Sequence, residues 1–172
     1  IRQGCYKQAE VCAKQISEPA QSIFRVNITL CFHADQRRKE ASEPLPEGVL
    51  TLVEAENKLD ALLSSGFPPV VQSQLQLHLS TCRFLMSTWD GAVNSLNLAF
   101  APALEVLDRR EDAEEQRIQR AHLTAAYYKM LLMYLPRERW GGITLLNGLL
   151  PLEDALKVME TTVIGSEATV EQ

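Results

Sequence analysis

Apolar residues recur at intervals of three and four along almost the whole chain, and this spacing restricts the fold more than any other feature of the sequence. Residues three and four apart share one face of an α-helix, whereas alternate residues share one face of a β-strand. The segment 69–87 is typical, because Val71, Leu75, Leu79 and Met86 form one stripe when the segment is drawn as a helix. The spacing therefore predicts an all-α fold.

Breaks in the spacing divide the chain into about seven or eight expected helices. Pro19 ends the first helix, and the proline-rich loop 42–48 ends the second. The β-branched run 23–32 is the place where a strand competes with a helix, and we expect a helix there. The expected helices cover 3–17, 20–40, 49–64, 69–87 and 90–107, then a sixth that follows a charged link at 108–120 and ends near Leu135, and two shorter helices within 138–160.

Short loops between helices of this length make neighbours antiparallel. We therefore expect helix hairpins, either stacked as a short solenoid or closed into a bundle. One helical domain is expected to cover 1–164, with the loop 42–48 as the place where it would divide. The segment 165–172 is expected to be a frayed tail, because its apolar spacing is lost.

Charge and apolar content exclude several classes of protein. A net charge of −5 is opposite to the basic excess of nucleic-acid-binding proteins, so we expect no nucleic-acid partner. The chain has no apolar run long enough to span a bilayer, so we expect no membrane span. Ile1 opens on polar sequence with neither Met nor a leader, so we expect a piece of a longer protein.

The cysteine usage favours a reducing compartment. Cys5 and Cys12 are too far apart on one helix to form a disulfide, and Cys31 and Cys82 are not placed as an obvious pair. The sequon at 27–29 (NIT) fits a secreted glycoprotein instead, but it lies in an apolar-periodic stretch where a glycan has no room. We expect buried free thiols and an intracellular protein, either cytoplasmic or nuclear.

The stretch 87–96 (STWDGAVNSL) has the spacing of a turn between two packed helices. A large aromatic residue at Trp89 closes the turn, and the small side chain of Ala92 lets the helices approach. Leu96 and Ala99 continue the contact with one bulky and one small residue. We therefore assign Trp89, Ala92, Leu96 and Ala99 to packing at a helix-hairpin turn rather than to chemistry.

This spacing resembles the second half of a tetratricopeptide (TPR) repeat, whose turn and second helix favour an aromatic residue, then alanine, leucine and alanine. Ser80 matches the small residue of the repeat's first helix, whereas Arg83 stands where an aromatic residue is usual. No second copy follows at the TPR period of about 34 residues. The resemblance implies TPR-like helix hairpins that serve as scaffold or adaptor.

A second resemblance covers 53–96, which runs from a helix through a glycine-containing turn and a Pro-Val helix start to the aromatic turn and the alanine-bearing helix. It looks like the helical domain shared by the C-terminus of the COPII outer-coat large subunit and the steroid receptor RNA activator protein. Both resemblances imply helix hairpins, and neither implies an active site.

The residue types that carry catalysis or metal binding occur without complete sets of partners. His78 and Cys82 have a spacing that zinc sites use, but no second pair of ligands accompanies them. Cys31 and His33 are poorly spaced for one helix. The chain lacks a Gly-x-Ser-x-Gly elbow and a glycine-rich phosphate loop. We therefore expect no enzyme activity, no metal and no cofactor.

Two surfaces are candidates for binding another protein. Too many apolar residues crowd the span 127–135 for all of them to face a single core. The first candidate surface lies on the sixth helix and the turn after it, and it comprises Tyr127, Tyr128, Lys129, Met130, Tyr134 and Trp140. The second is the basic rim of Arg37, Arg38 and Lys39, for which pairing with acidic neighbours on a solvated face is the alternative.

The leading hypothesis is a non-enzymatic module of a larger complex that presents a helical groove to a partner peptide or helix. One alternative is a structural assembly domain whose apolar surface is permanently buried against another subunit or the rest of a longer chain. The other is an enzyme with an unrecognised active site. A fragment that stays monomeric at high concentration favours the first hypothesis over the second, and a deep pocket with converging histidine and carboxylate groups favours the enzyme.

Overall fold

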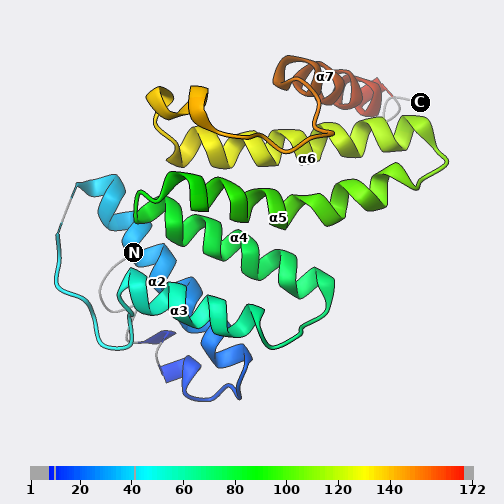
Figure 1. Ribbon diagram of the computed structural model, residues 1–172. Helices are drawn as coiled ribbons and strands as arrows, with labels where there is room; N and C mark the ends of the chain where they lie inside the picture. The colour runs from blue at the N-terminus through cyan, green and yellow to red at the C-terminus, as the bar shows by residue number, and fades with distance from the viewer. Residues whose placement is uncertain (1–7, 10, 41, 169–172) are drawn as a thin grey trace. The chain divides into compact units, whose positions relative to one another are not determined.

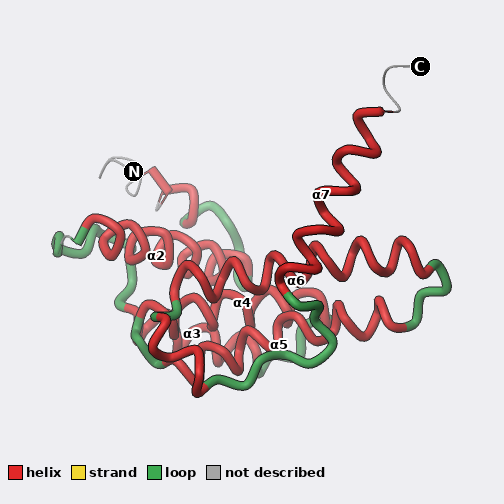
Figure 2. Tube along the Cα trace, turned by 90° about the horizontal axis from the view of Figure 1, so that it is seen from above, coloured by secondary structure: helices red, strands yellow, loops and turns green. Residues whose placement is uncertain are grey.

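The computed structural model describes residues 8–9, 11–40 and 42–168. Every regular element in this part of the chain is helical (Figures 1 and 2), so the prediction of an all-α fold is confirmed. None of these helices is both long and apolar enough to cross a membrane. The elements are α2 (Ala20–Lys39), α3 (Leu52–Leu63), α4 (Pro69–Leu85), α5 (Trp89–Asp108), α6 (Ala113–Tyr134), the 3-10 helix η1 (Arg137–Gly142) and α7 (Leu152–Ala168).

A capping box fixes the start of α3, three residues later than the apolar spacing predicts. Glu54 N donates to Thr51 Oγ1 at 3.2 Å, and Thr51 N donates to Glu54 Oε2 at 2.8 Å. The bond from the Thr51 backbone, followed by that from its hydroxyl, holds the pKa of the Glu54 carboxyl below its ordinary value. The two residues thus satisfy backbone donors that the first turn of α3 cannot pair internally.

The prediction of a charged link at 108–120 is wrong, because most of this segment is the first part of α6. Asp112 caps the helix, since its Oδ1 accepts hydrogen bonds from Glu114 N and Glu115 N, both at 3.0 Å. Arg117 pairs with Glu114 at 2.9 Å within the first turns. Charged residues spaced by one turn stabilise a solvated helix, so their density alone does not indicate a loop.

The first expected helix, 3–17, is also shorter than predicted. Its described residues are helical only to Ala13, and the chain then turns at 14–15. Gln21 Nε2 donates to Ala13 O at 2.9 Å, which satisfies a carbonyl that the helix leaves open. Cys5, which we placed on this helix, lies outside the described residues.

The two shorter helices expected within 138–160 are of different kinds. One is the 3-10 helix η1, and the other is α7, which begins directly after Pro151. Proline has no backbone N–H, and an N–H at the start of a helix has no acceptor within the helix. Pro151 is therefore well tolerated directly before α7. α7 continues to Ala168, into the segment expected to be a frayed tail.

The chain divides within α5 into two compact units, and each is described by itself. Unit 1 is Ile1–Ser95 and unit 2 is Leu96–Gln172. In unit 1, α2, α3 and α4 share one core, and Figure 1 shows α3 and α4 side by side. Its buried members are Val26, Leu30, Ala55, Leu59, Leu62, Leu75, Leu79 and Cys82. The single domain expected over 1–164 stays a prediction.

The non-helical segment before α3 is held on α2 by two polar side chains. Leu50 N donates to Thr29 Oγ1 at 3.0 Å, and His33 Nε2 lies 3.0 Å from Leu50 O. Thr29 is fully buried, so without this contact its hydroxyl and the Leu50 amide would lose hydrogen bonds away from water. The side chains of α2 therefore fix where α3 begins.

In unit 2 a similar but longer segment, 143–151, lies alongside α6 (Figure 1). Leu150 N donates to Thr124 Oγ1 at 3.1 Å, and Arg120 Nη1 donates to Gly148 O at 2.6 Å. Near its start, Asn97 Nδ2 donates to Thr144 O at 3.0 Å. Side chains of α5 and α6 therefore replace the backbone partners that a non-helical segment lacks.

The pair α2–α3 in unit 1 and the pair α6–α7 in unit 2 are built alike. Each second helix follows a glycine with positive φ and two apolar residues, in 48–50 (GVL) and 148–150 (GLL). The φ angles are 83° at Gly48 and 88° at Gly148. In both pairs a fully buried threonine of the first helix accepts the N–H of the second apolar residue.

The packing between the two helices of each pair also matches. Ala55 and Ala155 are both fully buried at the same position after these glycines, where a small residue lets the helices approach. The core of α2–α3 contains Ile23, Val26, Leu50, Ala55 and Leu59, and the core of α6–α7 contains, in the same order, Ile118, Ala121, Leu150, Ala155 and Met159. The two pairs thus share these contacts; we call the shared arrangement the two-helix repeat, and α4 and α5 lie between its two copies in the chain.

Replacing either threonine of the repeat with valine is expected to lower the free energy of unfolding by about 1–3 kcal/mol, because a partly buried amide loses its acceptor. Thr29→Val strands Leu50 N, and Thr124→Val strands Leu150 N. Urea unfolding measures both, with Thr144→Val at an exposed position as the control. Equal stabilities of Thr124→Val and Thr144→Val would contradict this account of the repeat.

The described cysteines differ in exposure. Cys12 and Cys31 are exposed free thiols, so the expectation of buried thiols is wrong for them, whereas Cys82 is buried. Burial first, and then the nearby Glu56 carboxylate, raise the pKa of the Cys82 thiol to about 12. At pH 8 only about one Cys82 thiol in ten thousand is then ionised to the reactive thiolate.

We therefore expect a Cys5→Ser variant to titrate two thiols with a chromogenic disulfide reagent at pH 8, and a third only after guanidinium unfolds the chain. The two are Cys12 and Cys31, and the third is Cys82. Adding Cys82→Ser removes the third thiol and serves as the control. Rapid modification of Cys82 in the folded chain would show that its surroundings open readily.

Candidate functional site

The turn between α4 and α5 combines a buried polar contact with a half-buried aromatic ring. Ser80 Oγ donates to Ala92 O at 2.8 Å, and both residues are fully buried. Trp89, the first residue of α5, is only half-buried. Leu96 and Ala99, further along α5, are buried. Trp89 is therefore the most accessible of the four residues that we assign to the hairpin.

Arg83 joins α4 to the two helices on either side of it in the chain. Its Nε donates to Glu56 Oε1 at 2.8 Å on α3, and its Nη1 donates to Ser95 Oγ at 2.9 Å on α5. A Cβ added at Gly91 would lie 3.4 Å from Arg83 Cδ, an ordinary van der Waals contact, so the stem of the arginine packs close to Gly91. The hairpin is thus joined by a partly buried ion pair.

The three cations of the basic rim are all held by groups of unit 1. Arg38 and Lys39 each lie 2.6 Å from a carboxylate oxygen of Asp35. The bond from Lys39, followed by that from Arg38, holds the pKa of Asp35 below its ordinary value. Arg37 Nη1 donates to Phe84 O at 2.9 Å, and its guanidinium lies 5.9 Å from the centroid of the Trp89 ring. All three charges of the basic rim therefore interact with groups of unit 1.

Tyr127 is wrongly assigned to a partner surface, because it is 0% exposed. Its hydroxyl donates to Asn97 Oδ1 at 2.6 Å and accepts from Leu146 N at 3.4 Å. Its ring packs edge-on against Phe100, with the centroids 5.6 Å apart. Burial, as the largest cause, raises the pKa of this phenol. Tyr127 therefore belongs to the core of unit 2.

The other residues of the first candidate surface differ in accessibility. Lys129 is exposed, whereas Met130, Tyr134 and Trp140 are half-buried. The rings of Tyr128 and Trp140 stack with centroids 6.3 Å apart, and Trp140 Nε1 donates to Leu135 O at 3.3 Å. η1 thus supports one side of Tyr128 and leaves its other side to α7.

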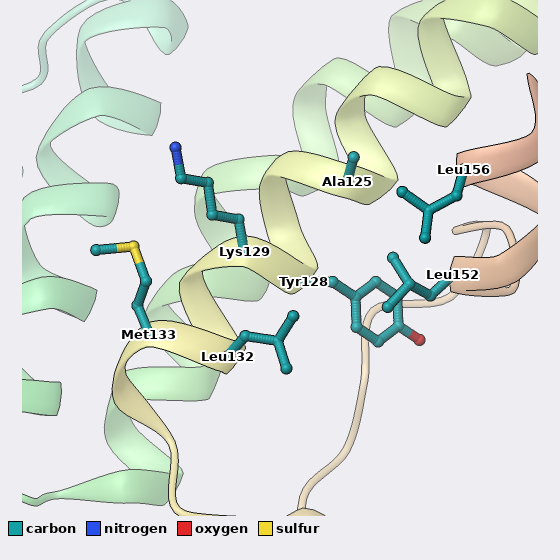
Figure 3. A pocket seen from close by; sticks show the side chains of 7 residues that line it. All are labelled: Ala125, Tyr128, Lys129, Leu132, Met133, Leu152 and Leu156. Atoms are coloured by element: carbon teal, nitrogen blue, oxygen red, sulfur yellow. The ribbon is translucent and has the colours of Figure 1, made fainter. Parts of the chain in front are cut away.

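A groove between α6 and α7 lies beside Tyr128 (Figure 3) and has a volume of about 300 Å³. We call it the α6–α7 groove, and its lining residues are Ala125, Tyr128, Lys129, Leu132, Met133, Leu152 and Leu156. Figure 3 shows Leu152 and Leu156 reaching from α7 toward Tyr128. Leu132 is 62% exposed, Met133 59% and Leu156 47%. A nearly continuous apolar surface is therefore open to solvent within unit 2.

The groove contains Tyr128 and Lys129 from the predicted surface, but its apolar residues are not among the predicted site residues. On α7, Leu152 and Leu156 lie at the edge of the buried stripe of Ala155 and Val158, which packs against α6. A signal was present in the sequence, because α7 has more apolar residues than one buried stripe needs. Choosing which stripe is buried requires the contacts of α6.

The lining of the groove has neither a histidine nor a carboxylate that would serve as a general acid or base. Among the described residues no three His, Cys, Asp or Glu side chains are grouped to hold a metal ion. His78 Nδ1 lies within hydrogen-bond distance of Gln74 O, at 2.7 Å, and burial lowers the pKa of the His78 imidazole. Comparison of the chain with protein-family models, characterised proteins and solved structures finds no match.

Proposed function

We propose that this chain is a non-enzymatic protein-interaction module, a scaffold or adaptor within a larger intracellular complex, whose α6–α7 groove receives a peptide or helix of a partner protein. The observation that supports this proposal most strongly is the exposure of Leu132, Met133 and Leu156 along one groove. Adjacent exposed apolar side chains of this size are typical of interaction sites. Single exposed leucines elsewhere on a surface carry no such meaning.

The chemistry of the groove agrees with the binding of a polypeptide. Its polar groups are few, namely the Lys129 ammonium and the Tyr128 hydroxyl, and Figure 3 shows both at side-chain ends that point away from Leu132. Such a lining gains affinity by burying apolar area, and a rim charge adds orientation. Because helices carry every lining residue, the surface is largely formed before a partner arrives.

The proposal is tested by affinity capture with the full chain as bait from an extract of cells that express it. Leu132→Asp is expected to reduce the captured amount of a specific partner at least tenfold, because docking would have to desolvate a carboxylate against apolar side chains. Leu98→Asp is the matched control, since Leu98 is 50% exposed on α5 outside the groove. If both variants capture the same proteins in the same amounts, the groove is not the interaction site.

Sedimentation of the isolated chain separates this role from that of a permanently buried assembly domain. We expect the 19.3 kDa monomer at concentrations of about 100 μM, because a docking groove for a transient partner leaves the chain stable alone. A dimer that Leu132→Asp dissociates would identify the groove as a surface for self-assembly instead.

A further inference from the structure

In unit 1 the two-helix repeat does not stand alone, because α4 covers it. Leu30 of α2 shares the core with Leu75 and Leu79 of α4. Cys82 Sγ donates to Leu52 O at 3.2 Å, at the start of α3. The two polar links to α4 described above, Arg83 with Glu56 and Arg37 with Phe84 O, complete the contact. Four positions of the repeat, 30, 37, 52 and 56, therefore mark the place where α4 docks.

The repeat in unit 2 has the same four positions, and all of them line the α6–α7 groove. Aligning Thr29 with Thr124 places Ala125 and Leu132 at the positions of Leu30 and Arg37. Aligning Gly48 with Gly148 places Leu152 and Leu156 at the positions of Leu52 and Glu56. Within unit 2 the described residues put no helix over this place, and Leu132 and Leu156 are exposed there.

We propose that the α6–α7 groove receives an amphipathic α-helix of a partner protein, in the position that α4 takes on α2 and α3 in unit 1. This inference rests on the proposed function and deepens it by naming the shape and the chemistry of the partner. The precedent for the occupant is inside the chain itself, where the same two-helix arrangement is completed by a third helix.

The differences between the two copies define the partner helix further. In α4 the stripe that faces the repeat is Leu75, Leu79 and Cys82, at spacings of four and three. Next to it, Arg83 meets the carboxylate of Glu56, but the counterpart of Glu56 in unit 2 is Leu156. The partner helix therefore carries an apolar residue where α4 has Arg83. Lys129 at the rim favours an acidic residue on its flank.

The direct test uses synthetic peptides based on α4 (Pro69–Leu85), labelled with a fluorophore and titrated with the full chain. The peptide with Arg83→Leu is expected to bind at least about tenfold more tightly than the unchanged peptide, because the arginine would meet Leu156 and Leu132 without a counter-charge. The Leu79→Asp peptide, whose apolar stripe is broken, is expected not to bind. Fluorescence anisotropy measures all three.

A variant of the chain then tests whether the register is that of α4 on α3. Leu156→Glu reproduces the carboxylate of Glu56 in unit 2, so the preference is expected to reverse in favour of the unchanged peptide by about tenfold. Leu98→Glu is the matched control and is expected to keep the preference of the parent chain. A preference that ignores Leu156→Glu would mean that the peptide binds elsewhere, for example by exchanging with α4, and would overturn the inference.

The outcomes separate this inference from the proposed function. If capture depends on Leu132 but none of the peptides binds, the groove takes a partner of another shape, and the helix inference is wrong while the function stands. The peptides could bind, and their order of affinity could reverse in Leu156→Glu, while capture of no partner depends on Leu132. The helix site is then supported and the proposed function fails. A dimer that Leu132→Asp dissociates would overturn the partner helix in favour of a second copy.

Discussion

Replacing Tyr127 with alanine is expected to lower the free energy of unfolding by about 3–5 kcal/mol, the range for a fully buried large aromatic side chain. The ring fills space beside Phe100, and the substitution leaves a cavity there. It also removes the acceptor of Leu146 N and the donor to Asn97 Oδ1. The loss is measured by urea unfolding that is followed by circular dichroism.

Tyr127→Phe separates the ring from its hydroxyl. It keeps the packing and is expected to cost about 1–3 kcal/mol, because Asn97 Oδ1 and Leu146 N lose a partner. Tyr128→Phe is the control. It is expected to change the free energy of unfolding little, because the Tyr128 ring is only half-buried. A Tyr127→Ala variant as stable as the parent would mean that Tyr127 is not a core residue and would restore it to the partner surface.

Replacing Phe84 with alanine is expected to cost about 3–5 kcal/mol as well, whereas Trp89→Ala is expected to cost only about 1–2 kcal/mol. The two aromatic residues flank the same turn, but Phe84 is 0% exposed and Trp89 is half-buried. The sequence alone makes Trp89 the packing residue of the turn, and Trp89→Ala would then lower the free energy of unfolding by about 3–5 kcal/mol. In the structure Phe84 is the more deeply buried ring, so Phe84→Ala is expected to cost more stability than Trp89→Ala.

Thermal and urea unfolding of both variants measure this difference. Thr88→Ala in the same turn is a control, since Thr88 is exposed and its hydroxyl donates to Arg83 O. Equal losses for Phe84→Ala and Trp89→Ala would contradict the burial of the two rings. A Trp89→Ala variant that keeps its stability but loses a partner would make the stretch 87–96 a binding site and our assignment of it to packing wrong.

The apolar spacing determined that the chain is helical and where most helices lie, because helix formation depends on neighbours three and four residues away. α2 and α4 were found to within a few residues, including the run 23–32 that competes with a strand. Boundaries that depend on a single side chain differ from those that the spacing predicts. Asp112 starts α6 inside a charged segment, and the capping box at Thr51 starts α3.

The apolar spacing of the sequence does not reveal the two-helix repeat. The similar stretches that begin at Gly48 and Gly148 are short, and the copies are separated by α4 and α5 rather than by a fixed TPR period. What makes the similarity convincing is that Thr29 and Thr124 each accept an amide from the segment that follows. Those hydrogen bonds join residues that are distant in the chain, and sequence spacing does not reveal them.

What the sequence alone determined is the class of fold and the presence of more apolar residues on α6 and α7 than one core can bury. Only the tertiary structure decided which of them are buried. Tyr127 and Tyr128 are neighbours in the chain, but a helix turns by about 100° from one residue to the next, so one ring enters the core and the other lines the groove. Burial is a property of contacts between distant segments, and Leu132 and Leu156 became candidates only when α7 was placed against α6.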